Sequence, residues 1–190
     1  MIKIKKCLFT CLLGVFTFFV VFTVYANTKV IYWGVYYPNP GYIPIGNVTY
    51  DYLSEYDAFY HGFANGEKVL YLTFDAGYED GNTEKILDSL KERNVPATFF
   101  LTGNYIKTNP EITKRMVNEG HIVGNHTMTH PDMYKLKSLD FASELEKVEE
   151  IYKDVIGFEM PKYYRPPACA FNEQNLIDAK ALKVLMICKD

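Results

Sequence analysis

A chain of 190 residues, of which 48% are apolar, has room for one folded domain with a sizeable core. The formal net charge is −3, and it becomes −6 if residues 1–26 are removed, because three of the 20 basic residues and none of the 23 acidic residues lie there. This acidity disfavours nucleic acid as a partner. Cys169 and Cys188, which lie outside that segment, could pair outside the cell, but they show no metal-type spacing and we assign them no chemistry.

The N-terminus is predicted to be a targeting segment rather than part of the fold. Three lysines within residues 3–6 precede an apolar run over residues 7–24, and Val24-Tyr25-Ala26 is suited to cleavage. The run is also long enough to remain as a membrane anchor. Residues 1–26 are therefore predicted to be a signal peptide or an N-terminal membrane anchor. The protein is expected to be exported, either secreted or anchored in the membrane.

Residues 27–67 are rich in Tyr, Pro, Gly and Asn and show no helical or strand period. We expect an aromatic-rich arm that lies over a domain formed by residues 68–190. Trp33 and the tyrosines are expected to anchor this arm, and stacking on sugar rings is the alternative.

The domain begins with residues 69–74, an apolar, β-branched and aromatic run that is typical of a strand buried on both faces of a parallel sheet. Asp75 follows directly, ahead of a turn that contains Gly77 and Gly81. Ligands and chemistry in α/β folds gather at the C-terminal ends of the strands. Asp75 is therefore either a catalytic carboxylate or the cap of the next helix.

Strand and helix then alternate along the chain. Asn109, Gly157 and Asn172 are expected to mark helix ends. Four successive β/α units without a hairpin signal indicate an α/β fold with parallel strands, as a barrel or an open sheet. Helices are predicted over residues 82–93, 110–120, 139–155 and from 173 onward, and strands over 97–103, 121–126 and 163–167.

Unusual polar side chains follow three of these strands: Asp75, the pair His126 and His130, and Arg165. The two histidines are four residues apart, so both imidazoles could bind one metal ion. Surface histidines are the commoner explanation for such a pair alone, but its position after a buried strand and before Pro131 favours a metal. Arg165 precedes two prolines that fix its backbone. It could reach across the strand ends, or it could form a structural ion pair.

Three motifs in this order resemble the polysaccharide deacetylases (carbohydrate esterase family 4): Thr-Phe-Asp-Ala-Gly at 73–77, His-Thr-Met-Thr-His at 126–130 and Arg-Pro-Pro at 165–167. Segments at 78–82, 95–100 and 120–126 further resemble the delta-lactam-biosynthetic, muramic-acid de-N-acetylase branch. The resemblance implies a distorted (β/α) barrel. It also implies a metal-dependent hydrolase that removes the N-acetyl group from a cell-wall glycan, with N-acetylmuramic acid of peptidoglycan as the expected target.

Within that resemblance, Asp75 corresponds to the general base, His126 and His130 to the metal ligands, and Arg165 to the residue that holds the base. The implied cofactor is a divalent metal ion, zinc, manganese or similar, and the implied partner is peptidoglycan or another N-acetylated glycan. The sequence leaves open whether the role is in sporulation, on the spore cortex, or in the vegetative wall. Ala76 stands where most of the family has a second Asp as third metal ligand, a change also common in the muramic-acid branch. Its loss predicts weaker binding of a hard cation.

The C-terminal part departs from the family. Ala168-Cys169 replaces a Gly-containing turn, and the later motifs, an Asp-Trp pair and a Leu-x-His that carries the general acid, have no counterpart. Residues 179–190 also lack a glycine between the last helix and the next strand. We expect an incomplete barrel in a C-terminally truncated catalytic domain with little or no activity of its own.

Two other functions remain open at this point. A catalytically dead glycan-binding remnant of such an enzyme would keep the groove and lose the reaction. A TIM-barrel glycosidase would need two carboxylates that flank the sugar bond, and Asp75 is the one acid with a matching context at a strand end.

Overall fold

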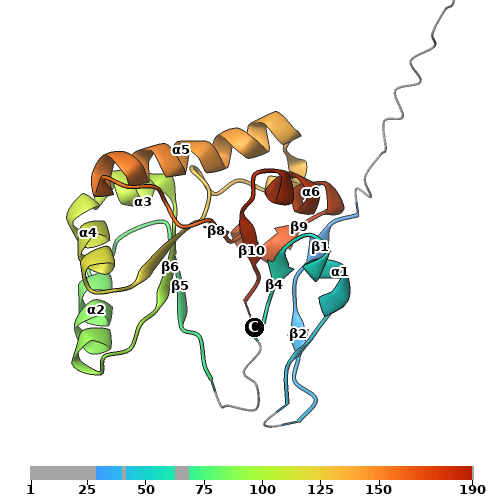
Figure 1. The fold of residues 1–190 in the computed structure, drawn as a ribbon, viewed down its shortest axis with the longest axis horizontal. Coiled ribbons are helices and arrows are strands. Elements are labelled where there is room, and N and C mark those ends of the chain that lie inside the picture. Colours follow the sequence, from blue (N-terminus) through green and yellow to red (C-terminus); the bar gives the residue numbers. More distant parts are fainter. Residues whose placement is uncertain (1–28, 40–41, 63–68, 190) are drawn as a thin grey trace, which may run out of the picture.

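The computed structural model describes residues 29–39, 42–62 and 69–189 (Figure 1). The expected leader over residues 1–26 lies outside these ranges and stays a prediction. Within these ranges, every helix is too short or too polar to cross a membrane.

A six-stranded parallel sheet forms the centre of the fold. Its strands lie in the order β4-β10-β8-β7-β6-β5, and every pairing within it is parallel. The predicted α/β class is therefore confirmed. Since β4 and β5 are its two edges, the described strands form an open sheet, as expected for an incomplete barrel. The strands are β4 (Ala58–Phe59), β5 (Thr73–Ala76), β6 (Thr98–Leu101), β7 (Ile122–Asn125), β8 (Tyr163–Tyr164) and β10 (Leu185–Ile187).

Helices pack around the sheet, and the longest of them, α5, lies across the top of the view in Figure 1. The sequence predicted α2, α4 and α5 to within two residues at both ends, and it predicted the start of α6. It missed α3, because a six-residue helix is too short to show a period. The helices are α1 (Tyr50–Ser54), α2 (Thr83–Glu92), α3 (Gly103–Thr108), α4 (Pro110–Asn118), α5 (Ser138–Ile156) and α6 (Glu173–Ala181), with short 3-10 turns at Met133–Lys135 and Pro167–Cys169.

The helix boundaries marked by Asn109, Gly157 and Asn172 lie where predicted, but one of the expected side-chain caps does not form. The Asn172 side chain caps α6 by accepting a hydrogen bond from the Asn175 N–H, and Gly157 ends α5 with a left-handed φ of 93°. Asn109 precedes α4 but its side chain does not cap that helix. Its amide donates instead to the Tyr105 carbonyl at 3.1 Å, at the end of α3. The prediction that the Asn109 side chain caps α4 is wrong, because this side chain is hydrogen-bonded to the end of α3.

The segment up to residue 62 differs from the expected irregular arm. It contains α1 and β4, and β4 pairs in parallel with β10 as an edge of the central sheet. Strand β1 (Ile31–Tyr32) pairs with β9 (Ala170–Phe171), and β2 (Val35–Tyr36) pairs with β3 (Ile45–Gly46). Strands of two residues cannot show a sequence period, which is why the pattern did not reveal them.

Trp33 anchors this segment, as expected. Its ring lies against Tyr60 with centroids 4.8 Å apart, and its indole N–H donates to the Lys189 carbonyl at 2.7 Å. Tyr32 adds a second contact, because its ring lies 6.1 Å from that of Tyr134 in the domain. The expectation is wrong for three other tyrosines, which are largely exposed: Tyr36, Tyr37 and Tyr42.

The run before Asp75 is not buried on both faces, contrary to the prediction. The strand covers only Thr73–Ala76, and Val69, Leu70 and Tyr71 before it are 47%, 79% and 65% exposed. Because β5 is an edge strand whose described partner is β6, its apolar residues are only partly covered.

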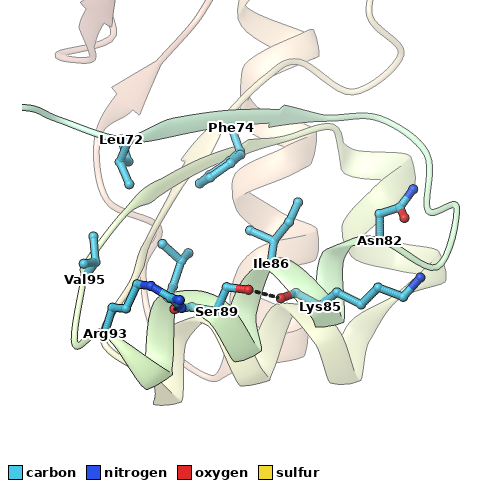
Figure 2. Close-up of a pocket in the computed structure, with 9 residues that line it drawn as sticks. Leu72, Phe74, Asn82, Lys85, Ile86, Ser89, Arg93 and Val95 are labelled. Atoms are coloured by element: carbon cyan, nitrogen blue, oxygen red, sulfur yellow. Dashed lines mark hydrogen bonds between the residues drawn. The ribbon is translucent and has the colours of Figure 1, made fainter.

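An apolar groove of about 510 Å³ lies between β5 and α2 (Figure 2). Leu72 and Phe74 point from the β5 segment toward Ile86 of α2, as Figure 2 shows. The Phe74 ring also stacks on Phe99 of β6, with centroids 5.0 Å apart. The apolar composition of this run indicated a central strand, but the run forms an edge strand. Its apolar side chains pack on β6 and line the groove beside α2.

The two cysteines outside the N-terminal segment are buried free thiols. Burial raises the pKa of the Cys188 thiol, and the nearby Cys169 acts in the same direction. Cys188 therefore stays protonated and unreactive, which agrees with assigning it no chemistry.

The link from α6 to β10 is made without a glycine. Lys183 takes a φ of 58°, in the left-handed region that glycine occupies at lower cost. Its N–H donates to the Lys180 carbonyl at 3.0 Å, and β10 then pairs with both β4 and β8. The lack of a glycine therefore does not prevent the step from helix to strand, which is made with a left-handed non-glycine residue and local backbone strain.

Replacing this residue by glycine is predicted to stabilise the protein. Lys183→Gly should raise the free energy of unfolding by up to about 1 kcal/mol, because the left-handed strain of a non-glycine residue exceeds the entropy that glycine adds to the unfolded chain. Urea denaturation measures the change, with Lys180→Gly in α6 as a control that should lose roughly 1 kcal/mol. A Lys183→Gly protein less stable than the parent would contradict the assignment of strain.

Candidate active site

The C-terminal ends of the strands bring the predicted site residues together. Asp75 lies in β5, His126 follows β7, Arg165 follows β8 and Lys189 follows β10. Because these strands are parallel members of one sheet, their C-terminal ends lie at the same edge.

The Arg165 side chain is only 2% exposed, and its guanidinium bonds to several neighbours. Its Nη1 donates to Asp75 Oδ1 at 2.8 Å and to Thr73 Oγ1 at 3.0 Å, and its Nε donates to the Ile187 carbonyl at 3.2 Å. The guanidinium also lies over the Phe100 ring, 4.1 Å from its centroid. A buried charge needs such partners, since an unpaired one is strongly destabilising.

The two carboxylate oxygens of Asp75 differ: Arg165 binds Oδ1 closely, whereas Oδ2 has a more distant neighbour. Its side chain is 26% exposed, and Lys189 Nζ lies 3.9 Å from the Oδ2 atom that Arg165 does not bind. Asp75 does not cap α2, whose N-cap residue is Asn82. A carboxylate fixed through one oxygen keeps the other available for a proton, as a general base requires.

His126 is buried and oriented by the backbone of Arg165. Its Nδ1 lies 2.8 Å from the Arg165 carbonyl oxygen. Because a carbonyl only accepts, Nδ1 carries the proton and the lone pair is on Nε2. Burial lowers the pKa of His126, and the negative charge of Asp75 opposes this effect. The site therefore favours a neutral imidazole with a free Nε2.

His130 faces His126 from the loop after β7. The two ring centroids are 5.0 Å apart and the rings are inclined by 70°. The His130 N–H donates to Thr127 Oγ1 at 3.0 Å, and both residues adopt left-handed φ values, 60° for His130 and 69° for Thr127. Such strained backbone in non-glycine residues is concentrated at functional sites.

Two residues that the sequence analysis missed hold this loop. Buried Asn125 accepts the Thr127 N–H at 2.9 Å and donates to the Leu145 carbonyl at 2.9 Å. The Glu144 carboxylate of α5 accepts the Thr129 N–H at 2.9 Å and its hydroxyl at 3.0 Å. An amide at the end of an apolar strand was a signal for Asn125, whereas nothing in the helical pattern distinguishes Glu144.

The turn after Arg165-Pro-Pro167 forms without the glycine that the family resemblance led us to expect. Ala168 and Cys169 adopt left-handed φ values of 52° and 48°. The Cys169 carbonyl accepts the backbone N–H of Trp33 at 3.1 Å, so the residue directly after β1 supports this strained turn.

The side chains present suit a divalent cation with imidazole ligands. Within the three described ranges, no group of three or more His, Cys, Asp or Glu residues could hold a metal ion. A buried neutral His126 with a free Nε2, faced by His130, offers two ligands of the kind that zinc and similar ions accept, and Ala76 adds no carboxylate. His126 and His130 are therefore the residues that fit such an ion, with its other positions left to water or substrate.

Known proteins are similar to this chain in sequence and in fold. The polysaccharide deacetylase family model matches residues 62–187. Peptidoglycan-N-acetylmuramic acid deacetylase PdaA of Bacillus subtilis is 47% identical over 131 residues, which cover 68% of this chain and 49% of PdaA. Peptidoglycan-N-acetylglucosamine deacetylase of Bacillus cereus is 42% identical over 127 residues, which cover 67% of this chain and 46% of that protein. The solved structure of B. subtilis PdaA, a family 4 carbohydrate esterase, matches with a TM-score of 0.79 at 39% identity and covers 85% of this chain and 69% of that one.

The chain spans about half the length of these two curated relatives. The region matched by the family model contains Asp75, His126, His130 and Arg165, and it makes up well over half of the chain. The identity to PdaA extends over two thirds of the chain and is accompanied by the same fold. The chain belongs to the polysaccharide deacetylase family.

Proposed function

We propose that this protein hydrolyses the N-acetyl group of a cell-wall glycan, with N-acetylmuramic acid of peptidoglycan as its target. The observation that carries the proposal is the Asp75 carboxylate, held at 2.8 Å by the buried Arg165 beside the facing imidazoles of His126 and His130. The chain is 47% identical to the relative named for N-acetylmuramic acid and 42% identical to the one named for N-acetylglucosamine, which supports the former sugar as the target.

Asp75 is the proposed general base. Its Oδ1 is held by Arg165, and its second oxygen, which lies 3.9 Å from Lys189 Nζ, would take a proton from the water that attacks the acetyl carbonyl carbon. The C–N bond then breaks, the acetyl group leaves as acetate, and the sugar amine receives a proton. Arg165 keeps the carboxylate in one orientation throughout, so little reorganisation is needed as the proton moves.

His126 and His130 are the proposed ligands of a divalent cation such as zinc or manganese. A cation at this position supplies Lewis-acid polarisation of a carbonyl and lowers the pKa of water. The protein keeps His126 ready for this role by burying it and by fixing its Nδ1 on the Arg165 carbonyl. One residue, Arg165, therefore orients both the base and a metal ligand.

We further propose that residues 1–26 export the protein, as a cleaved signal or as an anchor, because peptidoglycan lies outside the cytoplasmic membrane. Residues 68–190 would then form the catalytic region at the cell wall, with β4 as the strand that the preceding segment adds to its sheet.

A catalytically dead glycan-binding protein is the second candidate. It is favoured by one observation: within the described ranges, no group of three or more His, Cys, Asp or Glu residues could hold a metal ion. Acetate release from N-acetylated peptidoglycan in the presence of zinc separates the two candidates. Release above the protein-free background supports hydrolysis, and binding of glycan and zinc without release supports the second candidate.

Removing the proposed base should stop the reaction without disturbing the site. Asp75→Asn is expected to lower acetate release by at least about 10²-fold, because an amide cannot accept the proton of water. Circular dichroism and zinc titration should match the parent. Asp80→Asn, which removes an exposed acid from the following loop, is the matched control and should keep parental activity. Release by Asp75→Asn within about tenfold of the parent would rule out its role as base.

The histidine pair should account for metal binding. Calorimetric titration with zinc is expected to show that His126→Ala and His130→Ala each lose most of the affinity, because the site has few other protein ligands. His130 is exposed, so its replacement tests the site without opening the core. His61→Ala is the control and should bind zinc as the parent does. Unchanged affinity in both site variants would contradict the assignment.

A further inference from the structure

Lys189 brings a second cation to the proposed reaction centre. It follows β10, and its Nζ lies 3.9 Å from the Oδ2 atom of Asp75. That distance is too long for a hydrogen bond, and Nζ donates no hydrogen bond to any other residue within the described ranges. Because an ammonium carries three donors, Lys189 can offer them to a ligand.

The main chain at Lys189 is fixed by neighbours before and after its side chain. The Cys188 N–H donates to the Phe59 carbonyl of β4 at 2.8 Å. The Lys189 carbonyl accepts the indole N–H of Trp33 at 2.7 Å. The side chain therefore starts from a fixed point, so binding a ligand through the ammonium costs only the ordering of its stem.

Arg165 brings the end of β10 to the end of β5, although β8, β7 and β6 lie between them in the sheet. Its Nε donates to the Ile187 carbonyl at 3.2 Å, and its Nη1 donates to Asp75 Oδ1 at 2.8 Å. The sheet must therefore curve so that the ends of β5 and β10 meet at one buried guanidinium. Lys189 lies two residues beyond Ile187, and its place beside Asp75 follows from this packing.

Two cations face the single carboxylate of Asp75. Arg165 is the closer one, and its 2.8 Å contact offsets the charge of the acid. Lys189 lies farther away and its side chain is 59% exposed, so its charge is surplus to that pair. A surplus ammonium at a binding site favours a ligand that carries a negative group.

The charged side chains of the neighbouring loop after β7 are engaged with that loop. Asp132 pairs with Lys135 at 2.6 Å. The Glu144 carboxylate accepts the N–H and the hydroxyl of Thr129. Of these charged residues and Lys189, Lys189 is therefore the one whose donors remain open to a ligand.

N-acetylmuramic acid carries a negative group next to the bond that would be cleaved. Its acetamide is attached to C2 of the ring, and its lactyl ether, which ends in a carboxylate, is attached to the adjacent C3. A sugar whose acetyl carbonyl reaches Asp75 therefore brings the lactyl group into the region that a long lysine side chain can reach. N-acetylglucosamine has a neutral hydroxyl at C3 and offers Lys189 no charge.

We propose that Lys189 is a specificity-determining residue that binds the free lactyl carboxylate of the sugar that reacts at Asp75. The inference rests on the proposed function and deepens it, because it assigns the choice between an anionic and a neutral sugar to one side chain. Binding the carboxylate also draws the ammonium away from Oδ2, which leaves that oxygen to the attacking water.

Calorimetric titration of the full chain with two matched glycans, in the presence of zinc, tests this role. One probe is the tetrasaccharide of alternating N-acetylglucosamine and N-acetylmuramic acid with free lactyl carboxylates, and the other is the same tetrasaccharide with neutral lactyl carboxamides. The parent should bind the acid form about three- to fivefold more tightly, as expected of an exposed charge pair, and high salt should reduce this preference. Lys189→Met should bind both forms equally, whereas Lys189→Arg, which keeps the charge, should retain the preference.

Lys91→Met is the matched control, because it removes a similarly exposed lysine that also faces a carboxylate. The Lys91 side chain is 67% exposed, and its Nζ lies 3.1 Å from Glu119. Glu119 precedes β7, so this pair lies at the opposite edge of the sheet from Asp75. Lys91→Met should keep the parental preference for the acid form.

The outcomes separate this inference from the proposed function. Equal Kd values of the parent for the two glycans, a preference that survives in Lys189→Met, an equal loss in Lys91→Met, or no binding by the parent would overturn the role of Lys189. A Lys189-dependent preference without acetate release would leave that role standing and reject hydrolysis. Acetate release with a preference independent of Lys189 would do the reverse.

Discussion

The buried guanidinium of Arg165 is the constraint on which the site depends. With its side chain 2% exposed, it has to be satisfied by neighbours, and these come from β5 (Asp75 and Thr73), from β6 (the Phe100 ring) and from β10 (the Ile187 carbonyl). The carbonyl at the end of β7 accepts its backbone N–H at 3.0 Å. Arg165, which follows β8, is therefore in contact with β5, β6, β7 and β10. The contacts that satisfy this charge are the same ones that orient the proposed base and the first metal ligand.

The sheet beneath Arg165 is closely fitted, and the strain lies in the loops above it. A Cβ at Gly124 would lie 2.7 Å from the Phe100 ring, so glycine is needed where β7 passes the residue that supports the guanidinium. The loops that follow the strands carry left-handed residues, among them Thr127, His130 and Ala168. Rigid strand ends with strained loops are the arrangement expected where side chains must be held for chemistry rather than for stability.

The sequence predicted the long helices, the parallel sheet and the polar residues at its edge, because each rests on a local signal: a helical period, an apolar run, or a polar residue directly after one. It failed where the decisive contact is distant. The two residues of β4 are a strand only because β10 lies beside them, and Lys183 takes the place of an expected glycine because β10 has to reach its neighbours. The exposure of Leu70 follows from the edge position of β5, which composition does not encode. The Glu79 carboxylate accepts the Tyr105 hydroxyl across 26 residues, so this hydrogen bond had no local pattern either.

Anomalous diffraction from zinc-grown crystals of the protein tests the central claim most directly, because it locates the ion and the base in one experiment. The account predicts one zinc peak in contact with imidazole nitrogens of His126 and His130, with the Asp75 carboxylate still bound to Arg165 beside it. A peak held by other residues, no peak at the histidine pair, or an Asp75 side chain turned away from Arg165 would contradict the account.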